Sequence, residues 1–193
     1  MAKSKKGAVN AGDVSGKLAT AIMRLVANIP ASKIKKQREP QASSAQRINV
    51  SAAKAALAAG GLALPPGPIG WLTILPEMVA VWRIQAQLVS DIAAIHGRKG
   101  TLRPEQMFYC LFNHVAPQAV RGLGAGGERS GVASTEALQA VARKVGLRLS
   151  QRALGRGIAR WFPVVGAGFV GAYVYYDTTQ VGKAALEVFG KEG

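Results

Sequence analysis

The helical character of this chain is clearest in residues 62–97, LALPPGPIGWLTILPEMVAVWRIQAQLVSDIAAIHG. In the second half of this stretch, apolar residues recur three and four positions apart, which predicts a helix over 77–96 with one apolar face. The residues of that face are Met78, Val81, Trp82, Leu88, Ile92 and Ile95. Arg83, Gln87 and Asp91 lie away from it.

The first half of the stretch is interrupted by prolines, which lack a backbone N–H and clash with the preceding turn of a helix. Residues 55–76 carry no charge, and these 22 residues are nominally long enough to span a bilayer. Four prolines disfavour a straight span. We therefore expect 62–76 to form an irregular apolar hairpin, buried in the fold or dipped into lipid, with Pro65, Pro66 and Pro76 in packing roles.

Helical spacing continues on both sides of this stretch. We expect further helices at 13–29, 51–59, 101–115, 135–159 and 164–189. Pro30 is expected to end the first of these, and Thr101 to cap the third. The connecting segments are a disordered basic arm at 1–12, a polar linker at 31–49 and a glycine-rich loop at 121–133. Because no run alternates with period two, we predict an all-α protein: a single bundle of about six helices forming one domain, 13–193.

The composition points to a polyanionic partner. The chain has 193 residues, a net charge of +15, 49% hydrophobic residues and a mean hydropathy of +0.13. Such a charge favours nucleic acid or anionic lipid, and the long uncharged runs favour lipid. The sole cysteine, Cys110, excludes an intramolecular disulfide and indicates a reducing compartment. No apolar signal core follows the basic start, so we expect no cleaved signal peptide.

A row of basic residues in the 135–159 helix and just beyond it is the strongest candidate binding site. No acidic residue occurs between Glu136 and Asp177, so these cations have no local partner to neutralise them. The row consists of Lys144, Arg148, Arg152, Arg156 and Arg160, followed by Trp161. We expect it to contact anionic lipid, helped by the basic arm and by the preference of tryptophan for the membrane interface. The alternative is an ordinary solvated helix face.

Residues 164–171, VVGAGFVG, match the G-x-G-x-x-G dinucleotide fingerprint at Gly166, Gly168 and Gly171. That motif requires a following strand and a downstream acidic residue at its end, and the residues after Gly171 read as helix instead. We therefore expect these glycines to serve close helix packing, and we predict no cofactor.

Cys110 and His114 lie four apart and so share a helix face, where they could form a nucleophile pair or half of a metal site. Too few other ligands accompany them, and no C-x-x-C or H-E-x-x-H motif is present. The favoured interpretation is a buried cysteine beside an ordinary histidine. No catalytic or metal-binding residue is predicted.

Two stretches resemble the EcsC family, which is named after a bacterial protein encoded beside an ABC transporter. Residues 61–97 share its Gly/Pro-rich apolar opening and its Leu75-Pro76 step before a long helix. Residues 160–185, RWFPVVGAGFVGAYVYYDTTQVGKAA, are similar to a second family motif that ends in Val-Gly-x-Ala-Ala. Residues 105–113 stand where the family has a Phe-Leu helix. The resemblance implies a helical, membrane-associated bacterial protein and assigns no reaction.

The expected function is that of a non-enzymatic accessory protein in transport or secretion. It would be cytoplasmic, peripheral to the inner membrane or inserted by its hairpin, and bound to anionic lipid, with a membrane protein as a further partner. The alternatives are a nucleic-acid-associated protein and a delivered, membrane-acting toxin. Trp71, Trp82 and Trp161 lie within or beside apolar segments rather than between basic residues, which disfavours a base-stacking surface.

Overall fold

The computed structural model describes residues 11–62, 70–120, 135–155 and 163–190. Within these ranges the backbone forms seven helices and no strand, which confirms the all-α prediction. The helices are α1 (Ala11–Ala27), α2 (Pro40–Leu62), α3 (Gly70–Ile95), α4 (Pro104–Phe112), α5 (Pro117–Val120), α6 (Thr135–Gly155) and α7 (Pro163–Phe189).

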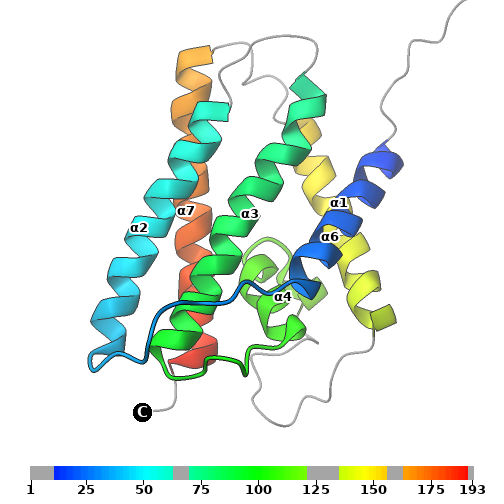
Figure 1. Ribbon diagram of the computed structural model, residues 1–193. Helices are drawn as coiled ribbons and strands as arrows, with labels where there is room; N and C mark the ends of the chain where they lie inside the picture. Colours follow the sequence, from blue (N-terminus) through cyan, green and yellow to red (C-terminus); the bar gives the residue numbers. More distant parts are fainter. Residues whose placement is uncertain (1–10, 63–69, 121–134, 156–162, 191–193) are drawn as a thin grey trace, which may run out of the picture.

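Three long helices, α2, α3 and α7, pack side by side as the main bundle (Figure 1). The chain runs along α2 in one direction and along α3 and α7 in the other. The short helix α4 lies at one end, against α3 and α7, and α5 packs against α4 and α6. On the far side of α4, α1 pairs with α6, so the first described helix lies beside one encoded more than a hundred residues later.

The hydrophobic core lies where α1, α3 and α4 meet. Leu18 and Ile22 of α1 and Ile92 of α3 are buried there, together with two phenylalanines of α4. The rings of Phe108 and Phe112 are 5.1 Å apart, and Trp82 of α3 meets Phe112 edge-on at 5.5 Å. The apolar face expected for residues 77–96, most of which belong to α3, is therefore a face that packs.

The helix α2 is longer than the sequence indicated. Residues 40–49 were expected to belong to a polar linker, and that prediction is wrong, because α2 begins at Pro40. Its buried face is made largely of small side chains, including Ser44, Ala52 and Ala55, which give little hydrophobic periodicity. Small residues allow close approach: a Cβ added at Gly182 of α7 would lie 2.5 Å from the Ile48 side chain.

The start of α3 also differs from expectation. Residues 70–76 were expected to be irregular, but α3 begins at Gly70 and contains Pro76, so the hairpin prediction is wrong for these residues. The remainder of that segment, with Pro65 and Pro66, lies outside the described residues. Thr101 does not cap a helix: its hydroxyl donates to the Arg98 carbonyl at 2.9 Å, and α4 begins later.

Within the part of the chain that the structure describes, one segment is long and apolar enough to cross a membrane, Met78–Ile95 of α3. Two thirds of it, 67%, is buried inside the protein. This is the behaviour of a core helix, so the segment by itself is weak support for a membrane span.

Candidate functional site

Residues 28–39, here called the strap, cross the outer side of α3 as they connect α1 to α2 (Figure 1). Hydrogen bonds fix the strap to that helix. The backbone N–H of Gln37 donates to the carbonyl of Ile95 at 3.1 Å. The hydroxyl of Ser32 accepts from the N–H of Ile34 at 3.1 Å and donates to the carboxylate of Asp91 at 2.7 Å.

Asp91 is the anchor of the strap. Its side chain is 2% exposed, although it lies off the apolar face of α3. Besides the Ser32 hydroxyl, its carboxylate accepts from Gln87 Nε2 at 2.9 Å and from Arg47 Nε at 2.7 Å, and Arg47 Nη2 completes the ion pair. A buried carboxylate is tolerated when it is paired and hydrogen-bonded in this way. The network therefore ties the strap, α2 and α3 together.

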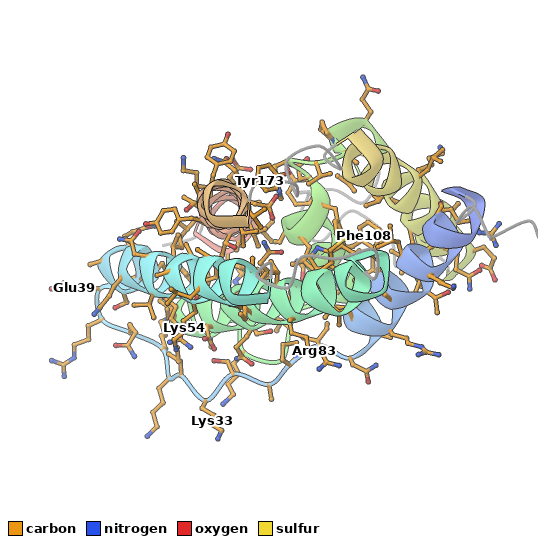
Figure 2. All side chains as sticks on the ribbon, turned by 90° about the horizontal axis from the view of Figure 1, so that it is seen from above. Lys33, Glu39, Lys54, Arg83, Phe108 and Tyr173 are labelled. Carbon is orange, nitrogen blue, oxygen red and sulfur yellow. The ribbon has the colours of Figure 1, made fainter. Side chains whose placement is uncertain are left out.

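The anchored strap displays cations to solvent. The side chains that we call the basic face are all exposed: Lys33, Lys35, Lys36 and Arg38 of the strap, Lys54 of α2 and Arg83 of α3. Figure 2 shows Lys33, Lys54 and Arg83 on one side of the layer formed by α2 and α3, and Tyr173 of α7 on the opposite side. None of the six forms an ion pair with another described residue. Glu39 is the exposed acid beside them.

The basic row expected on the 135–159 helix is placed only at its start. Lys144 lies on α6 and is exposed. Arg148 and Arg152 also belong to α6, with side chains outside the described set. Arg156, Arg160 and Trp161 lie outside the described residues altogether. Sequence reasoning missed the basic face because its cations come from three segments that are brought together only by the fold.

Cys110 and His114 do not form a nucleophile pair. Cys110 is fully buried, and burial, followed by the negative charge of Glu187, raises the pKa of its thiol, so the reactive thiolate is disfavoured. The His114 imidazole pairs instead with Asp177 of α7, at 2.6 Å from Nε2 to Oδ1. Gln85 of α3 donates to the same carboxylate at 2.8 Å. His114 lies in the turn after α4, which ends at Phe112, so the expected helix face shared with Cys110 is not formed, and these contacts join that turn to α3 and α7. No described group of three His, Cys, Asp or Glu side chains forms a metal site.

The three glycines of the dinucleotide-like motif all lie inside α7, so the strand and turn that a dinucleotide site requires are not formed there. Gly171 faces α2, where an added Cβ would stand 3.4 Å from the Ala56 carbonyl oxygen. The surroundings of Gly166 and Gly168 lie outside the described side chains. The packing role of those two remains a prediction.

His96, directly after α3, should make the stability of the fold depend on pH. Its Nε2 lies 3.3 Å from the Ser44 hydroxyl, and burial lowers its pKa from the ordinary value of 6.5. Because the folded state disfavours the protonated ring, we expect the free energy of unfolding to fall as the pH drops below about 6.5 toward the folded pKa. Urea titrations of the wild type and of His96→Gln at pH 7.5 and 5 measure this. An equal pH dependence in both proteins would contradict it.

Comparison of the chain with protein-family models, with curated proteins and with solved structures found no match, so its resemblance to the EcsC family remains a prediction.

Proposed function

We propose that this chain is a non-enzymatic accessory protein that binds the anionic surface of a membrane and serves transport or secretion there. The observation that carries the proposal is the basic face, six exposed cations gathered from the strap, α2 and α3. The strap is held in place by the Asp91 network, so these charges are displayed on a fixed surface. The basic row that begins at Lys144 is a second contact for the same kind of lipid.

The energetics favour such a role. A lysine or arginine near an anionic leaflet contributes about 1 kcal/mol, so six together suffice for reversible attachment. The attraction extends over a Debye length of about 8 Å at physiological salt, which makes binding sensitive to ionic strength. Lysine supplies four of the six cations. Its ammonium group is a strongly hydrated point charge and lacks the planar fork by which arginine binds a single phosphate through two hydrogen bonds.

Nucleic acid is the other polyanion that the charge would attract. A non-specific single-strand binder combines a basic groove with aromatic side chains on which the bases stack. The large exposed aromatic side chains among the described residues are tyrosines of α7, and Figure 2 places Tyr173 on the side opposite the basic face. The arrangement therefore supports lipid over nucleic acid.

The first test removes two cations of the strap. We expect Lys33→Gln/Lys35→Gln to bind vesicles containing a third phosphatidylglycerol roughly 30-fold more weakly, from about 1 kcal/mol per cation. The control is Lys99→Gln/Lys183→Gln, which has the same net charge and replaces exposed lysines outside the basic face. Sedimentation with anionic and with neutral vesicles at several salt concentrations gives the affinities.

Equal weakening in the two double variants would show that net charge alone matters and would remove the basic face from the mechanism. Equal binding to neutral and anionic vesicles would contradict the proposed function. Tighter, salt-sensitive binding to duplex or single-stranded DNA than to the anionic vesicles would favour the nucleic-acid alternative. A third double variant, Lys144→Gln/Arg148→Gln, measures how much the basic row contributes to the affinity for anionic vesicles.

A further inference from the structure

The outer side of α7 is exposed in the part of the chain that the structure describes. The helix packs against α2, α3 and α4 through its inner side, where Thr178, Val181 and Ala185 are buried. The opposite side carries a row of residues spaced alternately three and four apart, which keeps them on one line along the helix. This row, here called the α7 stripe, consists of Tyr173, Tyr176, Gln180, Lys183 and Glu187. Gln180 is half-buried and the other four are exposed.

The chemistry of the α7 stripe suits a protein partner. Tyr176 is 61% exposed, and tyrosine is one of the residues that dominate the binding energy of protein interfaces. Its hydroxyl, the Gln180 amide and the Lys183 ammonium form no hydrogen bond or ion pair with another described residue. The charges of Lys183 and Glu187 disfavour burial of this side in the hydrocarbon of a membrane.

The α7 stripe is complementary to itself when two copies run antiparallel. A two-fold axis near residue 178 places Tyr176 of one copy between Gln180 and Lys183 of the other, and the symmetry repeats the same contacts in reverse. A lysine ammonium over a tyrosine ring forms a cation–π contact, and a glutamine amide is a hydrogen-bond partner for the tyrosine hydroxyl. Alternate spacing of three and four is also the spacing of the seam along which two helices pack. These features select a second copy of the chain as the occupant.

The distribution of charge favours this arrangement although the net charge is +15. Figure 2 places Tyr173 on the side of the α2–α3 layer opposite the basic face. Pairing through α7 therefore keeps the two basic faces apart, one on each outer side of the dimer. Within the α7 stripe the single base and the single acid balance each other.

We propose that two copies of the chain pair antiparallel through the α7 stripe and that the dimer holds two anionic membrane surfaces together. The pairing stands on the α7 stripe alone. The bridging rests on the proposed function, because it requires each basic face to bind lipid.

Sedimentation velocity over a series of protein concentrations measures the pairing, and we expect a monomer–dimer equilibrium. Tyr176→Glu should raise the dissociation constant of the dimer roughly 30-fold, because the two-fold axis removes the tyrosine contact twice. The matched control is Tyr175→Glu, which adds the same charge at the neighbouring exposed position, off the α7 stripe, and should leave the constant unchanged. Circular dichroism confirms that both variants are folded.

Disulfide formation tests the antiparallel arrangement. When Tyr176→Cys and Gln180→Cys proteins are mixed and oxidised, we expect the mixed disulfide to exceed either self-pair, because positions 176 and 180 face each other across the axis. Cys110 is fully buried and stays out of the reaction. A dominant self-pair of Tyr176→Cys would overturn the antiparallel pairing.

Clustering of anionic vesicles, followed by dynamic light scattering, tests the bridging. We expect wild type and Tyr175→Glu to cluster the vesicles, and Tyr176→Glu to bind them without clustering. Vesicle sedimentation at protein concentrations below the dissociation constant of the dimer reports the monomer, so Lys99→Gln/Lys183→Gln stays a valid control there.

The outcomes separate this inference from the proposed function. Wild type that stays monomeric over its whole soluble range, or a dimer that Tyr176→Glu leaves intact, overturns the pairing. A dimer that binds anionic vesicles without clustering them overturns the bridging and leaves the proposed function intact. A dimer that dissociates with Tyr176→Glu but does not bind anionic vesicles supports the pairing and contradicts the proposed function.

Discussion

Replacing Arg47 by alanine should lower the free energy of unfolding by about 3 kcal/mol, since removal of one partner leaves an uncompensated buried charge. The carboxylate of Asp91 would remain 2% exposed in the present fold and would keep only its contacts with Ser32 and Gln87. Arg47 itself is 34% exposed, so we place the loss at the lower end for such pairs. Urea denaturation at pH 7 followed by circular dichroism measures it.

The matched control is Lys54→Ala, two helical turns along α2, which removes an exposed cation with no ion-pair partner among the described residues. Its effect should stay within about 0.5 kcal/mol. The double variant Arg47→Leu/Asp91→Leu removes both charges and should recover part of the stability lost by Arg47→Ala. If Arg47→Ala and Lys54→Ala proved equally stable, Asp91 would not be the anchor of the strap.

Truncation of Phe108 to alanine should cost about 3–5 kcal/mol, the range found for large core aromatics. Its ring is completely buried beside Phe112, in the core that α1 and α4 share with α3. Because the described contacts between the α1–α6 pair and the main bundle pass through α3, α4 and α5, loss of this ring should loosen that attachment first.

Hydrogen exchange can show whether the α1–α6 pair loosens before the main bundle. In Phe108→Ala the amides of α1 and α6 should lose more protection than those of α2 and α7, which pack against each other away from this core. Val50→Ala, at a 40% exposed position of α2, is the control and should change stability by less than about 0.5 kcal/mol. A uniform loss of protection in Phe108→Ala would show that the two parts unfold as one unit.

Most helices could be predicted from the sequence because their signal is local. The expected segments 135–159 and 164–189 correspond to α6 and α7 with small shifts at the ends, since apolar spacing and prolines act within a few residues. The beginning of α2 could not be found in this way. Its packing face relies on serine and alanine, which carry no hydrophobic periodicity, and its burial becomes evident only when α7 lies against it.

The position of the basic face could not be predicted from the sequence, and its polyanionic partner stays a prediction. The net charge of +15 is the basis of that prediction, but the surface that displays the charge depends on contacts between distant residues. Asp91 binds Ser32 and Arg47, which lie 59 and 44 residues away in the chain, and no local pattern indicates such a pairing. The basic row was visible because its members recur four positions apart in one stretch of the sequence. The basic face was not, because it combines a strap and two helices.

The pairing of α1 with α6 has a consequence for the order in which the protein folds during synthesis. Residues 11–27 leave the ribosome long before their partner helix, which spans 135–155. At about 5–20 residues per second, α1 waits roughly 6–25 seconds for α6. During that time Leu18, which is buried against Gly146 of α6 in the finished protein, lacks that contact. We therefore expect nascent chains that end before residue 135 to depend on chaperones for solubility, and full-length chains to be released from them.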